Sequence, residues 1–543
     1  MNRTRVYLAR GFVVMWLLGL MGCIEETYET PFTIHESDIH TIKPIALKPA
    51  TESQTDFWDA NQTPPPSMEL SIETCRTAAL QNNLELKTRL MDPVIADERV
   101  QRERAKFDAI FSSGMSLRKN DSPGVNQLAQ ITGTTTEQTS AQVGLSIPLS
   151  SGGTFSGNLS DNRQKDFPGS AFDPSYSPSS QLSFRQPLLR NGGSNVTHYS
   201  IRIAGIDHQI VQLQTKLEVI KVIADLDRVY WRLYAAQQEY DVREQQYQLA
   251  QAQLETAQRL VKLGEQPQIE VMRAEAGVAE RVEAIITAKN AMEDRQRDLK
   301  RAINSPNLDL KGQTHILVKT PPRPVRYELD KKGLVDYALK SRMEMLELQL
   351  QLAQDALTID YRKNQKLPQV IFDYQYNVGA TGGRRSSAYD VLWTNRFAGH
   401  YFGLNLEIPV GNHAAQSQWR QALYERIQRL SSTEDRRSQI ELEVLNAVDQ
   451  LETNWQRIIA SQHNSVLNQR LYEAEKRQYE QGLRTSTEVL DVQTKYADAE
   501  LAELTALVEY QISLVDLAYA TGTLLGAANI EWEPIVPGVL KNR

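Results

Sequence analysis

The chain has 543 residues, of which 60 are Lys or Arg and 67 are Asp or Glu, and its net charge is −7. This mildly acidic balance, with both signs interspersed, gives no basic footprint for nucleic acid and argues against a nucleic-acid partner. The eight histidines are scattered without metal-ligand spacing, and no phosphate-binding loop or catalytic constellation is recognisable. We therefore expect no enzyme, no metal site and no cofactor.

The first 22 residues resemble a bacterial lipoprotein signal. Three arginines within the first ten residues precede a short apolar segment, 12–21, and a glycine stands immediately before Cys23. Cleavage there would leave Cys23 as the lipidated first residue of the mature chain. By resemblance to enterobacterial lipoproteins, Ile24 in place of an aspartate favours the outer membrane. The alternatives are an uncleaved anchor helix and an ordinary export signal.

The remainder is predicted to hold two internal repeats, residues 68–310 and 327–526, with a linker at 311–326 and a tail at 527–543. Residues 23–67 are too rich in proline and polar side chains to form a core, so we expect an extended, lipid-anchored tether. The repeats share a register before their strands, because Leu70, Ala79, Leu80 and Leu84 recur at one constant spacing as Leu329, Ala338, Leu339 and Met343. Each repeat is expected to run helix, strands, long helix, tip and returning helix. The alternative is convergent composition, because Ala, Glu, Gln, Arg and Leu suit any exposed helix.

Two stretches of about seventy residues predict very long helices. From Ser194 to Leu263 there is one glycine and no proline, and from Asn412 to Gln481 there is neither. At about 1.5 Å per residue each helix would be roughly 100 Å long, far beyond an ordinary globular helix. Each turns at a tip that contains a glycine, Gly264 or Gly482, which permits left-handed backbone.

Alternating apolar and polar residues predict β-strands between the short and the long helices. We expect strands at 369–378 and 400–409 in the second repeat, and two to four in the first, from 109–118, 140–149, 154–163 and 180–188. Such strands suit a transmembrane β-barrel, although a soluble, half-buried sheet shows the same alternation. Because four to six strands cannot close a usable pore alone, the barrel interpretation requires a cyclic oligomer.

In this order the segments resemble the TolC-like outer-membrane efflux proteins from about residue 68 to residue 526. The motifs are Phe107-Asp108 before the first strand, Arg185-Gln186-Pro187-Leu188-Leu189 and Glu407-Ile408-Pro409-Val410 before the long helices, and Tyr479-Glu480-Gln481-Gly482 with Glu488-Val489-Leu490-Asp491 at the second tip. The resemblance implies an α+β membrane protein, in which three copies close one transmembrane β-barrel that a long α-helical barrel continues across the periplasm. The family barrel has four strands per protomer, so the hairpin around residues 150–153 is a departure. An extra pair would give eighteen strands or else lie outside the membrane.

The resemblance also implies a function and partners. The homotrimer would be the passive outer-membrane exit duct of a tripartite efflux or type I secretion system, surrounded by outer-membrane lipid. Its periplasmic tip would be gated and docked to a periplasmic adaptor and an inner-membrane pump or ABC transporter. The alternative is a periplasmic coiled-coil scaffold lipoprotein whose β segments form a soluble sheet.

The resemblance assigns roles to five residues near the tips. Tyr479 and Arg484 match residues that hold the family's entrance closed, and Glu270 matches the acidic partner on the neighbouring tip. Glu488 and Asp491 match two acidic rings that line the entrance. Their i, i+3 spacing puts both carboxylates on one helix face, and such rings favour cations.

Other interpretations of the tip residues remain open. Glu488 and Asp491 are also acids of the kind that a helix favours in its first turn, and Tyr479 also suits ordinary packing between helices. The surroundings of Gly264 and Gly482 are candidate adaptor contacts. The remaining cysteine, Cys75, can form no internal disulfide if Cys23 is lipidated, and we expect it to pack in the first helix.

Overall fold

The computed structural model describes residues 66–125, 131–167, 172–265, 267–306, 308–312, 314–481 and 483–533. The predicted signal, Cys23 and the tether as far as residue 65 lie outside the described residues. The tip residue Gly482 and the last ten residues of the predicted tail lie outside them as well. The described residues belong to one compact unit that begins at Pro65.

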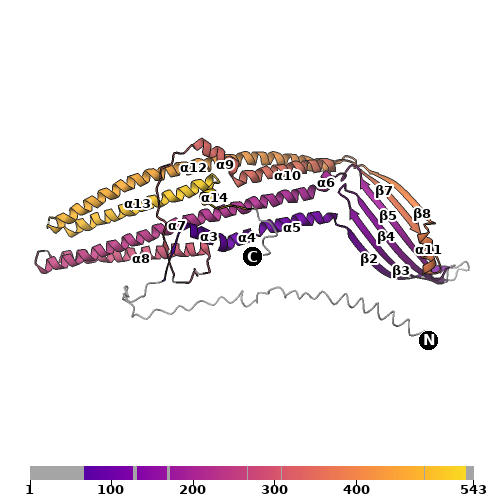
Figure 1. Ribbon diagram of the computed structural model, residues 1–543, viewed down its shortest axis with the longest axis horizontal. Coiled ribbons are helices and arrows are strands. Elements are labelled where there is room, and N and C mark those ends of the chain that lie inside the picture. The colour runs from indigo at the N-terminus through magenta and orange to yellow at the C-terminus, as the bar shows by residue number, and fades with distance from the viewer. Residues whose placement is uncertain are drawn as a thin grey trace, which may run out of the picture. The chain divides into compact units, whose positions relative to one another are not determined.

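Two long helical hairpins dominate this unit. Helices α7 (Tyr199–Lys262) and α12 (His413–Glu480) have 64 and 68 residues, so each is about 100 Å long at 1.5 Å per residue. They return as α8 (Ile269–Ile303) and α13 (Ser486–Ala520). Figure 1 shows the hairpins side by side, with both tips at one end. The prediction of two long hairpins is confirmed.

Shorter helices precede the strands in both repeats. The first repeat has α3 (Ile72–Asn82), α4 (Leu84–Arg89), α5 (Asp92–Arg104) and a 3-10 turn (Ala105–Phe107), and the second has α9 (Lys331–Ser341) and α10 (Met343–Gln365). The helical segment of the first repeat is interrupted between α4 and α5, where Pro93 lies in the first turn of α5. Proline is tolerated at the start of a helix but disrupts a helix interior. Helix α5 packs on α7, and α10 packs against both α7 and α12.

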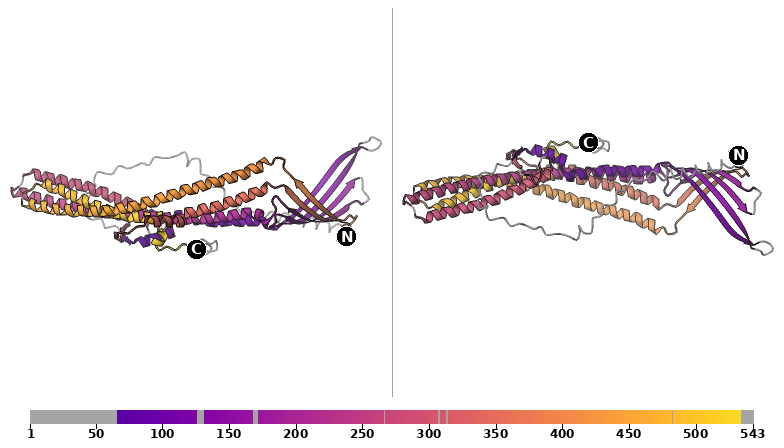
Figure 2. Two further views of the ribbon diagram at one scale, coloured as in Figure 1. Left: turned by 90° about the horizontal axis from the view of Figure 1, so that it is seen from above. Right: turned by 90° about the horizontal axis from the view of Figure 1, so that it is seen from below.

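Six strands form one antiparallel sheet at the opposite end from the tips (Figure 1). They are β2 (Ile110–Val125), β3 (Ile131–Pro148), β4 (Thr154–Phe167), β5 (Ser175–Pro187), β7 (Gln369–Gly379) and β8 (Ala398–Glu407). Their order in the sheet follows the chain, so the first repeat contributes four strands, the upper end of the expected range. Both views of Figure 2 show the strands beyond the ends of the long helices. The turn between β3 and β4 is tight, with the Leu149 N–H donating to the Gly153 carbonyl at 2.8 Å.

Several short elements were not expected from the sequence. Strand β1 (Ser67–Leu70) pairs in parallel with β6 (His315–Val318), so part of the expected linker is structured. Helix α11 (Arg385–Trp393) lies in the connection between β7 and β8. Two further short helices, α6 (Ser194–Thr197) and α14 (Leu524–Ala527), flank the helical hairpins. Across the described ranges, every helix is too short or too polar to be a candidate membrane span.

Each repeat has its own apolar core, and the two cores correspond. In the first, Leu226, Leu233 and Leu299 are buried. At the spacing that separates Gly264 from Gly482, these positions recur in the second core as Val444, Leu451 and Leu517. The predicted pair Ala79 and Ala338 is also buried, one residue in each core. The correspondence supports an internal repeat over convergent composition.

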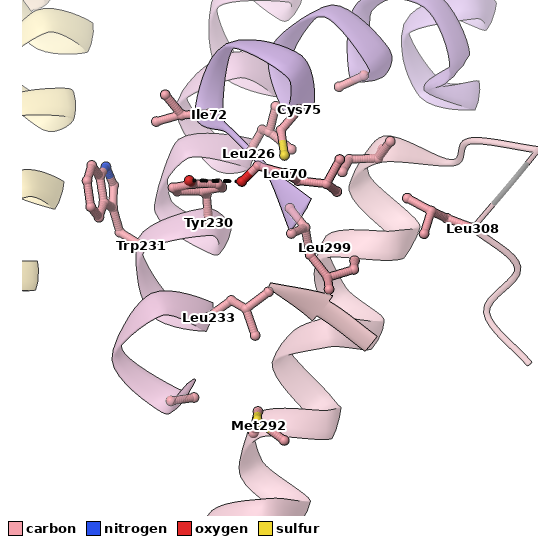
Figure 3. Packing of buried hydrophobic residues seen from close by; sticks show 14 of the residues in the cluster. Leu70, Ile72, Cys75, Leu226, Tyr230, Trp231, Leu233, Met292, Leu299 and Leu308 are labelled. Carbon is pink, nitrogen blue, oxygen red and sulfur yellow. Dashed lines mark hydrogen bonds between the residues drawn. The ribbon is translucent and has the colours of Figure 1, made fainter. Parts of the chain in front are cut away.

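The first core joins α3, α7, α8 and the small parallel sheet (Figure 3). The Tyr230 hydroxyl donates to the carbonyl of Leu70 at 3.3 Å and accepts from the N–H of Thr320 at 3.1 Å. Cys75 is fully buried in this core, which confirms that it packs in the first helix. Burial raises the pKa of its thiol to about 12, so the thiol stays protonated at neutral pH.

Candidate channel wall and entrance tips

The strand register gathers apolar side chains on one side of the sheet, called here the apolar face. One row runs Ile147, Phe155, Phe184, Tyr374 and Phe402, each residue directly opposite the next on the neighbouring strand. Because side chains alternate between the two faces of a strand, every second residue continues this face. It also includes Phe111, Met115, Leu117, Val143, Leu145, Leu159, Leu182, Val370, Phe372, Tyr376, Val378, Leu404 and Leu406.

Much of the apolar face is open. Met115 on β2 is 70% exposed and Leu404 on β8 is 66% exposed, although both are large apolar side chains. Monomeric soluble proteins rarely leave so wide an apolar surface uncovered, so the surface indicates a partner or a lipid environment. The face extends over all six strands, including the four of the first repeat.

The opposite face of the sheet is polar and internally hydrogen-bonded. Hydroxyl pairs link β4 to β5, with 2.6 Å between the Oγ atoms of Ser156 and Ser183. Farther along, Asp373 on β7 accepts hydrogen bonds from Arg185 of β5 and from Asn405 of β8, both at 2.8 Å. This face is therefore suited to contact with water.

The first helical tip is built around Gly264. Its φ of +76° is left-handed, which a residue with a Cβ adopts only with strain. The N–H of Glu265 donates to the carbonyl of Leu260 at 2.9 Å and closes the end of α7. Just beyond, Glu270 is only 7% exposed and accepts a 2.6 Å hydrogen bond from Arg273 in its own helix.

The second tip holds Arg484 in a set of contacts within one chain. Its Nε lies 3.0 Å from Oε1 of Gln478 and 3.0 Å from Oε2 of Glu475, and Nη1 lies 3.2 Å from Oε1 of Glu488. Within the chain, Arg484 thus pairs with its own hairpin, whereas Glu270 pairs with Arg273. Tyr479 is buried at the end of α12.

The two predicted acidic residues differ in their surroundings. Glu488 closes a capping box, in which its Oε2 accepts from the N–H of Thr485 at 2.8 Å. This backbone hydrogen bond is the main cause that lowers the pKa of Glu488. Asp491 is exposed and lies 2.7 Å from the Nζ of Lys495, one turn along α13. Glu488 thus caps the first turn of α13, as one of the two interpretations of the sequence predicted. Lys495 offsets part of the charge of Asp491.

The two hairpins contact each other near their tips through residues that were not predicted from the sequence. Gly277 of α8 faces Leu490 of α13 so closely that a Cβ there would lie 3.3 Å from a Leu490 methyl group. One turn further, the buried Arg281 donates to the hydroxyl of Thr494 at 2.5 Å. Gly277 is the only glycine of α8, which made it a candidate for close packing, whereas Gly205, the only glycine of α7, has no such close neighbour.

The fold of this chain is similar to that of solved outer-membrane channels. The model of the outer membrane efflux protein family matches residues 334–523, whereas no curated protein matches by sequence. The Campylobacter jejuni CmeC outer membrane channel has a similar structure, with a TM-score of 0.62 at 14% identity over 87% of this chain and 88% of that one.

Two further solved structures share this fold. The outer membrane protein VceC of Vibrio cholerae has a TM-score of 0.60 at 12% identity, over 83% of this chain and 96% of that one. The open state of the Neisseria gonorrhoeae MtrE outer membrane channel has a TM-score of 0.56 at 15% identity, over 83% and 89% of the two chains.

Proposed function

We propose that this chain forms a passive outer-membrane exit duct. Its second repeat matches the model of the outer membrane efflux protein family, and its fold is that of outer-membrane channels. The observation that carries the proposal is the apolar face, which continues over six strands with a polar face behind it. Apolar-out and polar-in alternation is what a transmembrane barrel requires. The matched family is one of channels, which fits a conduit that catalyses no reaction.

The sheet edges favour an assembly of identical copies. Strands β2 and β8 end the sheet within the described chain, and lipid offers no water to satisfy their unpaired backbone groups. If β8 of one copy pairs with β2 of the next, the edges disappear. Six strands are too few to enclose an aqueous channel, whereas barrels of sixteen to eighteen strands do so. Three copies would supply eighteen.

The estimated widths of the barrel and of the helical tunnel favour six strands per copy over four. With strands about 4.8 Å apart and tilted by about 40°, an eighteen-stranded barrel is roughly 36 Å across between backbones. At the same tilt, twelve strands would give roughly 24 Å. Helices α5, α7, α10 and α12 neighbour one another next to the sheet, and twelve such helices, about 10 Å apart, enclose roughly 38 Å. An eighteen-stranded barrel would thus continue the helical tunnel with little change of width.

The helical end would be the gated periplasmic entrance. In the assembled duct, Tyr479, Arg484 and the neighbouring Glu270 would form the latch, and Glu488 with Asp491 the cation-favouring rings. The exposed surroundings of Gly264 and Gly482 would dock a periplasmic adaptor, and an inner-membrane pump or ABC transporter would supply the energy. Lipidated Cys23 would anchor each copy, so Cys23→Ser should abolish acyl labelling; persistent label would place the anchor elsewhere.

Cysteine cross-linking in cell envelopes tests the edge pairing. Asn405→Cys on β8 would be combined with Ser112→Cys or Ser116→Cys on β2, all on the polar face. We expect disulfide-linked dimers and trimers from at least one pair. Asn405→Cys with Ser156→Cys or Ser160→Cys on β4 is the matched control, because two intervening strands hold these residues about 14 Å apart, beyond disulfide reach.

Each outcome of the cross-linking has one interpretation. Cross-links to β4 in place of β2 would show that the β2–β3 hairpin lies outside the barrel. A chain that cross-links at neither strand and remains monomeric would instead favour the periplasmic scaffold.

A further inference from the structure

Helix α11 covers one end of the otherwise open apolar face. Ala388 and Leu392 of the helix are buried, and Leu392 packs with Leu159, Tyr376 and Val378 of the apolar face. Figure 1 shows α11 at the end of the sheet that is remote from the long helices. If the apolar face meets lipid, as the proposed function requires, α11 lies on the outer wall of the barrel.

The apolar face becomes charged at the level of α11. The next residue on this face of β4 after Leu159 is Asp161, and Arg163 follows it opposite Tyr176. Arg385 of α11 contacts two residues of this charged end of the face. Its Nε lies 3.0 Å from Oδ2 of Asp161, and its guanidinium lies 5.5 Å from the ring centre of Tyr176.

The height of the apolar face agrees with this boundary. On β7 the apolar side chains run from Val370 to Val378. At about 3.3 Å per residue and a tilt of about 40°, they cover roughly 20 Å, close to the ~25 Å apolar band of outer-membrane barrels. Helix α11 therefore lies at the margin of that band, at the level of the lipid headgroups.

The outer side of this helix carries aromatic and basic side chains. Trp393 is 72% exposed and Phe397, just beyond the helix, is 61% exposed. Arg384 and Arg396 are exposed and form no ion pair among the described residues, and Asp390 is the one acid on the outward side of the helix. Aromatic rings concentrate at membrane interfaces, and arginines there bind anionic headgroups.

We propose that α11 is an interfacial helix seated in the headgroup layer of the outer leaflet. Trp393 and Phe397 enter the lipid, and Arg384 and Arg396 bind the phosphates of anionic headgroups. The proposal rests on the proposed function, because it requires the apolar face to meet lipid. It gives the connection between β7 and β8 the role of fixing the depth and tilt of the barrel in the membrane.

Spin-label accessibility in the full-length protein, reconstituted in phosphatidylcholine–phosphatidylglycerol vesicles, tests the position of α11. Labels would be placed by Trp393→Cys, by Leu404→Cys on the apolar face, and by Leu483→Cys at the exposed tip. We expect collisions with oxygen to dominate at 404 and, at a shallower depth, at 393, whereas a water-soluble nickel complex dominates at 483. Phe397→Cys is the second site if Trp393→Cys fails to assemble.

The labels separate the two proposals. Nickel accessibility at 393 and 397 with lipid accessibility at 404 would overturn the interfacial helix and leave the duct intact. Nickel accessibility at 404 would overturn the duct itself. A label at 393 that neither reagent reaches would show that residue 393 is buried in protein, within its own copy or against a neighbouring one, which also contradicts a lipid-facing helix.

The headgroup contact has a separate readout. The thermal midpoint of the reconstituted wild type should rise when phosphatidylglycerol replaces part of the phosphatidylcholine. Arg384→Gln/Arg396→Gln should lose most of this rise, whereas Arg470→Gln on α12 should keep it. An equal rise in the double variant would show that these arginines do not bind the headgroups.

Discussion

The buried ion pair between α3 and α7 gives the sharpest stability prediction. Arg76 donates to both oxygens of Asp227, at 2.9 and 2.7 Å, and the Asp227 side chain is fully buried. Arg76→Met would remove the partner and keep an apolar side chain of similar length. Because breaking a buried pair leaves an uncompensated charge, the expected loss is about 3–5 kcal/mol.

The same variant should show a definite dependence on pH. Burial raises the pKa of Asp227 above its ordinary value, against the opposing effect of Arg76, and removal of Arg76 should raise it further. A carboxyl with a raised folded-state pKa contributes most stability below its unfolded pKa of about 4 and loses it as pH rises through the folded pKa. The loss of folding stability caused by Arg76→Met should therefore be larger at pH 8 than at pH 5.

The assay is thermal unfolding of the detergent-purified protein, followed by far-UV circular dichroism at one fixed scan rate. Lys319→Met is the matched control, because it removes an exposed pair with Glu69 at 2.8 Å, which contributes about 0–1 kcal/mol. Arg76→Met/Asp227→Leu should recover much of the lost stability, since no buried charge remains. An Arg76→Met midpoint equal to that of Lys319→Met, with no pH dependence, would refute the reasoning.

Three further predictions concern the second tip. Arg484→Ala should raise the conductance of the isolated channel because it removes the cation that would pair with Glu270 of the neighbouring copy, whereas Arg477→Ala should leave it unchanged; equal conductance of the two variants would contradict the latch. Glu488→Gln/Asp491→Asn should reduce cation selectivity measured from reversal potentials in a salt gradient, and an unaltered reversal potential would remove these residues from the channel lining. Thr485→Ala removes the cap of α13 and should destabilise the tip by about 1 kcal/mol, seen as faster amide exchange at the start of α13; unchanged exchange would contradict the capping role.

The long elements were predictable because their signals are local. The absence of proline between Tyr199 and Lys262, and of both proline and glycine between His413 and Glu480, is enough to predict α7 and α12. The second-repeat strands follow from strict alternation, as in Val370 to Val378. Strands β2 and β3 extend beyond their predicted ends through polar residues on both faces, which carry no alternation of apolar and polar side chains.

The remaining elements depend on contacts that are distant in sequence. Strands β1 and β6 have four residues each and acquire their pairing only from each other. Helix α11 is short, and Ala388 and Leu392 define an inward side only where the sheet supplies Leu159 and Val378. At the second tip, the sequence indicated Arg484 by resemblance, but its contact with Glu475 depends on how the hairpin closes.

The most direct test of the proposed duct is single-channel recording from the purified protein in planar lipid bilayers, with its oligomeric state measured in the same detergent. A trimer that produces small, discrete, cation-selective conductance steps is the predicted result. A monomer that produces no conductance would contradict the duct and favour the periplasmic scaffold.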